Sequence, residues 1–407
     1  MKVLSLFSGC GGMDIGFEGG FSCLKKSINL EEHADWVANN NGDWVTLSPT
    51  KFRTVFANDI RPDAKAAWVS FFSCRINNAD DVYHLGSIVD LVRKHNTGDF
   101  VFPEGIDVVT GGFPCQDFSV AGKRLGFKSK KSHLGGTLDA GEPSTESRGK
   151  LYIWMREVIT ITCPKLFIAE NVKGLTNLED VKEIIERDFA EAGDGGYLVV
   201  PAKVLRAADY GVPQSRERVI FFGFRKNALT AGAMEALLSK DIPEEYDPYP
   251  LPTHGPGLLD YVTCSDAFTG LVEPEVATDK SQEKYSKAKY MGAHCQGQTE
   301  VKLDSVGPTI RSEHHGNIEY RRLSKEHGGK HDAELAAGLP ERRLTVRECA
   351  RIQTFPDEYQ FILAKTGKNV SVSSSDAYKI IGNAVPCVLA YNIAKNIERK
   401  WEKYFKE

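Results

Sequence analysis

The sequence predicts an α/β protein built on a doubly wound parallel sheet, with a second, smaller domain that is rich in loops. Three observations predict this fold. Short apolar runs alternate with amphipathic stretches through the first 225 residues, and a glycine-rich turn directly follows the first run. From about residue 226 prolines, histidines and polar runs replace this alternation. Strand–helix alternation is typical of parallel sheets, which bind ligands at the carboxyl ends of their strands.

The apolar runs predict five buried strands, with two helices between them. The expected strands are 2–7, 53–59, 105–112, 163–172 and 218–224, and the expected helices are 153–160 and 181–193. Helical patterning returns over 344–355 and 376–405, and the last helix should pack on the sheet. Two segments interrupt the pattern as insertions, 25–49 and 129–147.

Composition narrows the class of protein. The 407 residues are 41% hydrophobic and 26% charged, which suits a soluble globular chain with a large core. The net charge of −4 means that any nucleic-acid binding must come from a local basic cluster. No stretch approaches the roughly 18 apolar residues of a membrane helix, and the first run meets glycines too early for a signal peptide. We therefore expect a cytoplasmic protein that makes no membrane contact.

The nine cysteines are scattered, without a C-x-x-C pair or a Cys/His cluster. This distribution favours reduced thiols, and it argues against a metal site and against a disulfide framework.

The turn "LFSGCGGMDIGF" suggests a ligand site after the first strand. Gly9, Gly11 and Gly12 allow the backbone to turn tightly and to approach a ligand. At the end of the next strand, Asp59 could accept hydrogen bonds from a ribose, and Ile60 could lie against a purine. A plain glycine-rich turn is the alternative. Together the two loops favour a nucleoside-containing cofactor, while the missing Lys-Ser/Thr phosphate loop disfavours a triphosphate.

A cysteine follows a proline in "VVTGGFPCQDFS", just past the expected strand 105–112. Pro114 fixes its own φ and restricts Phe113, so the chain that leads to Cys115 is constrained. A small buried hydrophobe is one reading of such a thiol. A nucleophile is the other, and it needs acidic and basic groups nearby.

Those groups occur at neighbouring strand ends. Glu170 follows an apolar run, and Arg216 and Arg218 lie two apart where another strand begins, on the same face. Taken singly, the glutamate could cap a helix and the arginines could be surface residues. We expect all three to meet Cys115 at one sheet edge.

With these residues in place, the sequence resembles the cytosine-5 DNA methyltransferases of bacterial restriction-modification systems. The blocks that carry the resemblance stand in the family's order, from Leu6 to Pro386: "LFSGCGGMDIGF", "GGFPCQDFS", "RGKLY", "ENV", "QSRERV", "RRLTVRECARIQTFPD" and "GNAVP". The blocks are individually short, but jointly they are specific.

The resemblance implies a Rossmann-like methyltransferase fold that uses S-adenosyl-L-methionine to methylate C5 of a specific cytosine in double-stranded DNA. Residues 1–225 and 372–407 would form the catalytic, cofactor-binding domain, and 226–371 the target-recognition domain. Cys115 matches the nucleophile that adds to C6, and Glu170 the acid at N3. Arg218 matches the group that contacts O2, and Arg216 is similar to a supporting residue.

The cofactor residues are implied in the same way. They are Phe7, Ser8, Gly9, Gly11, Gly12, Asp59, Ile60, Ser87, Pro114, Leu151, Asn383 and Ala384. Ser87 departs from the family, which often has an acid near the adenine amino group; its hydroxyl could still hydrogen-bond the adenine.

A cytosine within a duplex cannot reach a thiol, so the resemblance also implies base flipping. The basic run after Cys115 could grip phosphates and close over the flipped base, although a solvated loop is the alternative. Thr309-Ile310 resembles a Thr-Leu or Thr-Ile pair of the family's recognition region, and His314 and His315 could be surface residues. The expected DNA contacts are Ser119, Lys123, Arg124, Thr309 and Arg311.

Three alternatives remain beside this reading. One is the tRNA-modifying branch with the same catalytic blocks, and another is a catalytically silent DNA-binding regulator. A methyltransferase of exocyclic amines is disfavoured, because Phe113-Pro114-Cys115 stands where such enzymes have Asp/Asn-Pro-Pro-aromatic. We expect a monomer, with a cognate restriction endonuclease as a functional rather than a physical partner.

Overall fold

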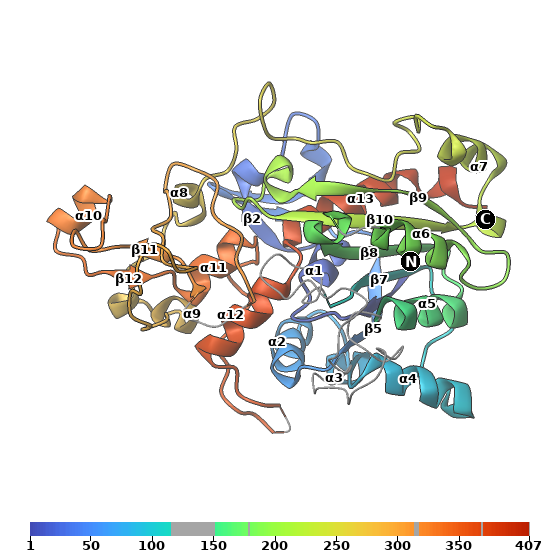
Figure 1. Cartoon of the computed structure of the whole chain (residues 1–407), viewed down its shortest axis with the longest axis horizontal. Helices are drawn as coiled ribbons and strands as arrows, with labels where there is room; N and C mark the ends of the chain where they lie inside the picture. The colour runs from blue at the N-terminus through green and yellow to red at the C-terminus, as the bar shows by residue number, and fades with distance from the viewer. Residues whose placement is uncertain (115–150, 178–179, 313–316, 368, 407) are drawn as a thin grey trace.

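The computed structural model describes residues 1–114, 151–177, 180–312, 317–367 and 369–406. A seven-stranded sheet forms its centre, in the order β6-β5-β1-β7-β8-β10-β9 (Figure 1). The strands are β1 (Lys2–Leu6), β5 (Arg53–Asp59), β6 (Tyr83–Leu85), β7 (Val108–Gly112), β8 (Leu166–Val172), β9 (Tyr197–Arg206) and β10 (Glu217–Arg225). The α/β class and all five predicted strands are confirmed.

At one edge of the central sheet, β10 and β9 depart from a purely parallel arrangement. β6, β5, β1, β7 and β8 pair in parallel, whereas β10 runs antiparallel to both β8 and β9. Only residues 207–216 connect β9 to β10, and they contain no α-helix. A parallel pair needs a longer crossover, so this short connection makes an antiparallel pair. β9 escaped prediction because it is partly exposed and lacks a continuous apolar run.

Successive residues of a strand point to opposite faces of the sheet, and both faces are covered. In β1, Val3 packs in one core and Leu4 in the other. In β8, Ile168 and Phe167 divide in the same way. The first core lies under α1 (Gly12–Glu18), α2 (Pro62–Phe72) and α13 (Cys387–Tyr404), and the second lies under α4 (Ile88–Lys94), α5 (Leu151–Thr162) and α6 (Val181–Ala190). The doubly wound arrangement is thus present.

Both helices predicted between strands form, as α5 and α6. The expected helix 344–355 appears as the shorter α11 (Val346–Ile352), with Thr345 as its N-cap. The expected helix 376–405 is two helices, α12 (Ser374–Asn383) and α13, because Pro386 lies between them and can start a helix but not continue one. α13 packs directly on α1, where Gly16 leaves no room for a Cβ beside Ala390.

The 25–49 insertion forms a small antiparallel sheet of its own. Its strands β3 (Val37–Asn41) and β4 (Trp44–Leu47) join β2 (Ser22–Leu24) in the order β2-β4-β3. Lys26 pairs with Asp266 of α8 (Cys264–Ala267) at 2.5 Å, and the Arg351 guanidinium lies 4.7 Å from the Trp44 ring centroid. The insertion therefore contacts the parts of the chain that follow the sheet.

Residues beyond the sheet form a small lobe with little regular structure, on the left in Figure 1. It contains α8, α9 (Lys280–Glu283), α10 (Asp332–Ala336) and a two-stranded sheet of β11 (Tyr320–Arg322) and β12 (Arg342–Arg343). Ion pairs made by two buried arginines hold it together: Arg342 bonds Glu348 at 2.9 Å, and Arg322 bonds Glu273 at 3.0 Å. Partial burial raises the pKa of Glu273, but hydrogen bonds from Arg342 and Arg322 outweigh it and bring the pKa to about 2.

Residues 226–250 pack beside the central sheet and α13 rather than in the small lobe. α7 (Ala231–Leu238) follows Thr230, whose N–H donates to the carbonyl of Tyr404 in α13. The Asn396 amide donates to the carbonyl of Pro248 at 2.8 Å, so the same helix anchors this connection. Among the remaining short helices is α3 (Ala79–Val82). No helix within the described ranges is long and apolar enough to cross a membrane.

Asp14 of α1 supplies a stability prediction. It is buried and accepts a hydrogen bond from Trp68 Nε1 at 2.7 Å. Burial raises its pKa from 3.8 to about 6, so the folded state binds the proton more tightly between these values. The protein should lose stability as the pH rises through this window, by about 3 kcal/mol in total.

Asp14→Asn removes the charge and keeps an oxygen for Trp68. We expect the variant and the wild type to unfold at similar urea concentrations at pH 4, and the variant to be the more stable one at pH 7.5. If the difference in stability between the two proteins were the same at pH 4 and at pH 7.5, this role of Asp14 would be contradicted.

Candidate active site

The ends of β7 and β8 lie side by side at the carboxyl edge of the sheet. In the register of these strands, Gly112 pairs with Glu170. A Cβ at Gly112 would lie 2.9 Å from Glu170 Oε2, so a larger residue here would displace this carboxylate. Cys115 comes three residues after Gly112 in the chain, but it lies outside the described residues. The structure therefore describes the partners expected around the thiol, and not the thiol itself.

Glu170 and Arg218 are brought together as expected. Arg218 Nε lies 2.7 Å from Glu170 Oε1, and about a tenth of each side chain is exposed. Arg218 Nη1 also donates to the backbone carbonyl of Glu217 at 2.7 Å, which fixes the guanidinium. The pair is possible because β10 runs antiparallel to β8, with Ile220 opposite Glu170 and Arg218 two residues earlier on the same face. A carboxyl–guanidinium pair thus faces the sheet edge where β7 ends.

Asn171 fixes the chain just before Pro114. Its Nδ2 donates to the carbonyl of Phe113 at 3.1 Å, and its Oδ1 accepts from the N–H of Val172. Both Asn171 and Phe113 are buried, so this bond is protected from water. The Asn of "ENV" therefore directs the chain out of β7 towards Cys115, a role that the sequence did not reveal.

Arg216 does not join Glu170 and Arg218. It is buried, and its Nη1 and Nη2 donate to the carbonyls of Ile310 (3.1 Å) and Gly382 (2.9 Å). Arg216 lies before β10 begins, so the two arginines do not share a strand face as expected, and their guanidinium groups have different partners. Arg216 therefore links the segment that contains Ile310 to the segment that contains Gly382.

The first glycine loop forms the second part of the site. Gly9 has a φ of 54° and Gly11 a φ of 82°, a region that favours glycine. The N–H of Gly9 donates to Asp59 Oδ2 at 3.0 Å, which joins the ends of β1 and β5. Burial raises the pKa of Asp59. Ile60 is 47% exposed, which leaves its apolar surface open to a ligand.

Several other residues predicted to bind the cofactor lie in or beside this loop. A Cβ at Gly12 would lie 3.1 Å from the Cβ of Ala384, so the first loop touches the segment between α12 and α13. Asn383 is exposed there, and Phe7 has the positive φ of 53°. The Ser8 hydroxyl donates to the Ser5 carbonyl and accepts from the N–H of Asn58.

Three further candidates differ in their exposure. The Ser87 hydroxyl is buried and caps α4 by accepting from the N–H of Val89 at 3.2 Å. Leu151 packs in the second core, and Pro114 is half-buried. Not all of the residues predicted to bind the cofactor therefore have side chains exposed near the first glycine loop.

Sequence reasoning missed some residues that shape this loop. The Tyr83 hydroxyl donates to the carbonyl of Gly9 at 2.8 Å, and the Asn58 amide donates to the carbonyls of His84 and Gly86. Asn58 stands directly before Asp59, so a polar residue inside an apolar strand was the available signal.

Comparison with known proteins identifies the family. A model of the family described as C-5 cytosine-specific DNA methylase matches residues 1–399. The chain belongs to the C-5 cytosine-specific DNA methylase family. It is similar to the Type II methyltransferase M.BsuRI of Bacillus subtilis, with 33% identity over 98% of this chain and 79% of that protein. M.BspRI of Lysinibacillus sphaericus is 32% identical over 100% of this chain and 83% of its own.

A solved structure shows the same fold. The S. pombe Dnmt2 methyltransferase aligns with a TM-score of 0.53, covering 98% of each chain at 18% identity. Its membership of the DNA methylase family makes the chain a DNA cytosine-5-methyltransferase, which acts on DNA and requires a methyl donor.

In this DNA methylase, the expected DNA contacts divide between described and undescribed residues. Ser119, Lys123 and Arg124 lie outside the described residues, as do His314 and His315. Thr309 is half-buried, and its hydroxyl donates to the carbonyl of Ser215 at 3.5 Å. Arg311 pairs with the buried Glu319 at 3.1 Å, so part of its charge is already engaged.

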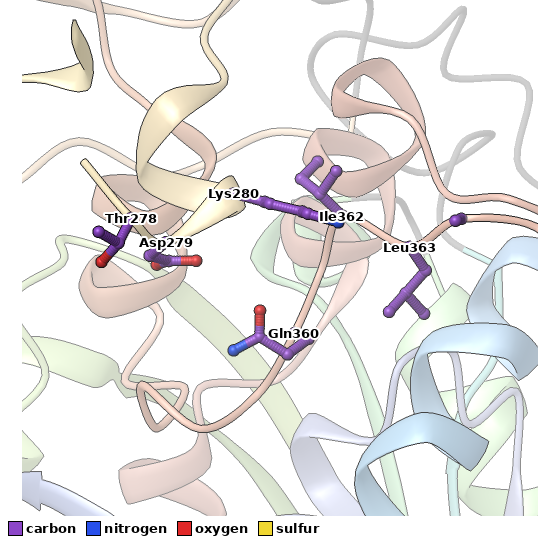
Figure 2. A pocket seen from close by; sticks show the side chains of 7 residues that line it. Thr278, Asp279, Lys280, Gln360, Ile362 and Leu363 are labelled. Carbon is purple, nitrogen blue, oxygen red and sulfur yellow. The ribbon is translucent and has the colours of Figure 1, made fainter. Parts of the chain in front are cut away.

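A cavity of about 460 Å³ opens elsewhere in the DNA methylase, between α9 and the segment after α11 (Figure 2). It is lined by Thr278, Asp279, Lys280, Gln360, Ile362, Leu363 and Ala364. None of the predicted site residues lines it. Asp279 is engaged with Arg347 through a 2.6 Å ion pair, so its charge is already paired.

Proposed function

We propose that this DNA methylase transfers a methyl group from S-adenosyl-L-methionine to C5 of one cytosine within a specific double-stranded DNA site. The cytosine is flipped out of the duplex, and Cys115 adds to its C6. The observation that carries this proposal is the 2.7 Å pair of Arg218 and Glu170 beside the end of β7. It supports a nucleophile at Cys115, because it supplies an acid and a cation where the chain leads to that residue.

The first loop supports a nucleoside cofactor of this kind. Among the described residues, no atom would lie within 4 Å of a Cβ at Gly9, so this part of the structure leaves space beside the backbone. Asp59 offers carboxylate oxygens to ribose hydroxyls, and Ile60 offers an exposed apolar side chain to the adenine. Asn383 and Ala384 would close the site from the other side. When bound, the cofactor supplies an electrophilic methyl group on a sulfonium.

The chain's residues would divide the remaining chemistry between them. The Cys115 thiolate forms a bond to C6, and the electron pair of the C5–C6 double bond becomes available at C5. Glu170 donates a proton or a hydrogen bond at N3, which withdraws electrons from C6, and Arg218 contacts O2. After C5 has accepted the methyl group, loss of the C5 proton expels the thiolate and restores the ring. Asn171 and Arg216 would act as positioning residues.

The role of the protein follows from its relatives. M.BsuRI and M.BspRI are Type II methyltransferases, so we propose that this chain is the modification enzyme of a restriction-modification system. Residues 226–371 would form the recognition domain, with 226–250 as a connection anchored on α13. Ser119, Lys123 and Arg124 would contact DNA phosphates, and Thr309 and Arg311 would face the target. It would act in the cytoplasm as a monomer.

Trapping of a covalent adduct tests this proposal. Duplex DNA with 5-fluorocytosine at the target blocks loss of the C5 substituent, so the protein should stay bonded to the DNA when S-adenosyl-L-methionine is present. We expect a shifted band on a denaturing gel with duplex DNA and none with tRNA. Bisulfite sequencing of DNA from a host that expresses the protein gives the target site beforehand. An unshifted band on that duplex would refute the covalent route.

A further inference from the structure

Two buried glutamines, Gln214 and Gln353, form a bridge between two loops that lie 139 residues apart in the chain. Gln214 Nε2 donates to Gln353 Oε1 at 2.9 Å, and to the carbonyl of Ile352 at 3.3 Å. Neither side chain is exposed. A buried amide that loses its hydrogen-bond partner destabilises the fold, so each group bonded to this pair is held firmly.

Gln214 holds the segment that carries Thr309. Its Oε1 accepts from the N–H of Ile310 at 3.0 Å. Backbone bonds reinforce the contact, because the N–H of Gly307 donates to Pro213 and the N–H of Ser215 donates to Gly307. The residues 307–311 are therefore fixed on the loop that leads into β10.

Gln353 holds the segment that carries Asn383. Its Nε2 donates to the carbonyls of Ile381 at 2.7 Å and Ala384 at 3.3 Å, on either side of Asn383. Gln353 follows α11, which lies beside α12 at the junction of the small lobe and the sheet (Figure 1). The two ends of the bridge are thus the two segments expected to meet DNA and cofactor.

Arg216 joins the same two segments a second time. One guanidinium donates to Ile310 and to Gly382. Gly382 has no room for a Cβ, because the backbone of Arg311 lies against it. The segments 307–311 and 381–384 are in direct contact and are tied by two buried polar bridges, so a shift of either one must be transmitted to the other.

We propose that Gln214 and Gln353 are positioning residues that couple cofactor binding to DNA binding. This rests on the proposed function, which puts the cofactor at Asn383 and the DNA at Thr309. A ligand that orders either segment also orders the other, so the second ligand binds a segment already in place and binds more tightly.

The test is the affinity of S-adenosylhomocysteine, the demethylated product of the cofactor, measured by calorimetry with and without the methylated target duplex. For the wild type we expect the duplex to tighten binding by a factor of about 5 to 150. Gln353→Met fills the space without hydrogen-bonding to Ile381, Ala384 or Gln214, and should bring this factor close to one. Because coupling between two ligands is reciprocal, S-adenosylhomocysteine should tighten DNA binding by the same factor in the wild type, and this factor should also fall close to one in Gln353→Met.

Gln282→Met is the matched control. Gln282 is equally buried, donates to the carbonyl of Val272 at 2.7 Å and accepts from the Thr345 hydroxyl at 2.7 Å, but it bonds to neither segment. This variant should keep the wild-type factor. If Gln353→Met does not fold, Gln353→Asn replaces it, because its amide is one methylene shorter and cannot reach both Gln214 and Ile381.

The outcomes separate the two proposals. Wild-type coupling in a folded Gln353 variant, or an equal loss in Gln282→Met, would overturn the positioning role. A wild type that methylates DNA with a factor of one would also overturn it, and would leave the proposed function intact. A wild type that binds cofactor product and DNA but transfers no methyl group would overturn the proposed function instead.

Discussion

Cys115→Ser is expected to abolish methyl transfer to duplex DNA, with a loss on the order of 10⁴-fold or more. A serine hydroxyl stays protonated near neutral pH and is a far weaker nucleophile towards C6 than a thiolate. The adduct with 5-fluorocytosine DNA should disappear in the same variant. The measurement is a single-turnover transfer of labelled methyl groups, so that slow product release does not mask the chemical step.

Cys74→Ser is the control for this experiment. Cys74 is an exposed, unpaired thiol whose Sγ contacts the carbonyl of Phe71, and a serine hydroxyl can make the same contact. We expect wild-type transfer from this variant. Full transfer by Cys115→Ser would remove the covalent step from the mechanism, whereas loss of transfer in both variants would point to a general effect of cysteine replacement.

Glu170→Gln is expected to lower the single-turnover rate by a factor of about 10² to 10⁴, the usual contribution of a general acid. The amide keeps the size of the side chain and an oxygen for Arg218 Nε, so the sheet edge should keep its shape. It cannot give a proton to N3, and C6 therefore stays a poor electrophile. Trapping with 5-fluorocytosine DNA should slow by a similar factor, because the affected step precedes methyl transfer.

Glu217→Gln is the matched substitution for this second prediction. Glu217 starts β10 next to Arg218, and its exposed carboxylate pairs with Lys173 at 2.9 Å. An exposed ion pair contributes little, so this variant should keep the wild-type rate. An unchanged rate in Glu170→Gln would assign Glu170 a structural part through its pair with Arg218. A slowed rate in both variants would trace the effect to the position of Arg218.

The partners of the two arginines show what could be predicted from the sequence and what could not. Glu170 and Arg218 were expected together, and the structure joins them. Arg216, two residues from Arg218, was expected beside them, but it donates to Gly382, which lies 166 residues away in the chain. Nothing local to "QSRERV" distinguishes the two arginines. Their partners depend on which loops pack against the start of β10.

The sequence by itself determined the strands β1, β5, β7, β8 and β10, the helices α5 and α6, and the family, because apolar periodicity and ordered motif blocks can be recognised in the sequence alone. Only the tertiary structure decided that β10 and β9 run antiparallel, that Asn171 fixes the carbonyl of Phe113, and that Gln214 meets Gln353. Hydrogen-bond partners and strand directions of this kind depend on contacts between distant segments. They form only when the chain buries both faces of the sheet and each enclosed polar group must find a partner.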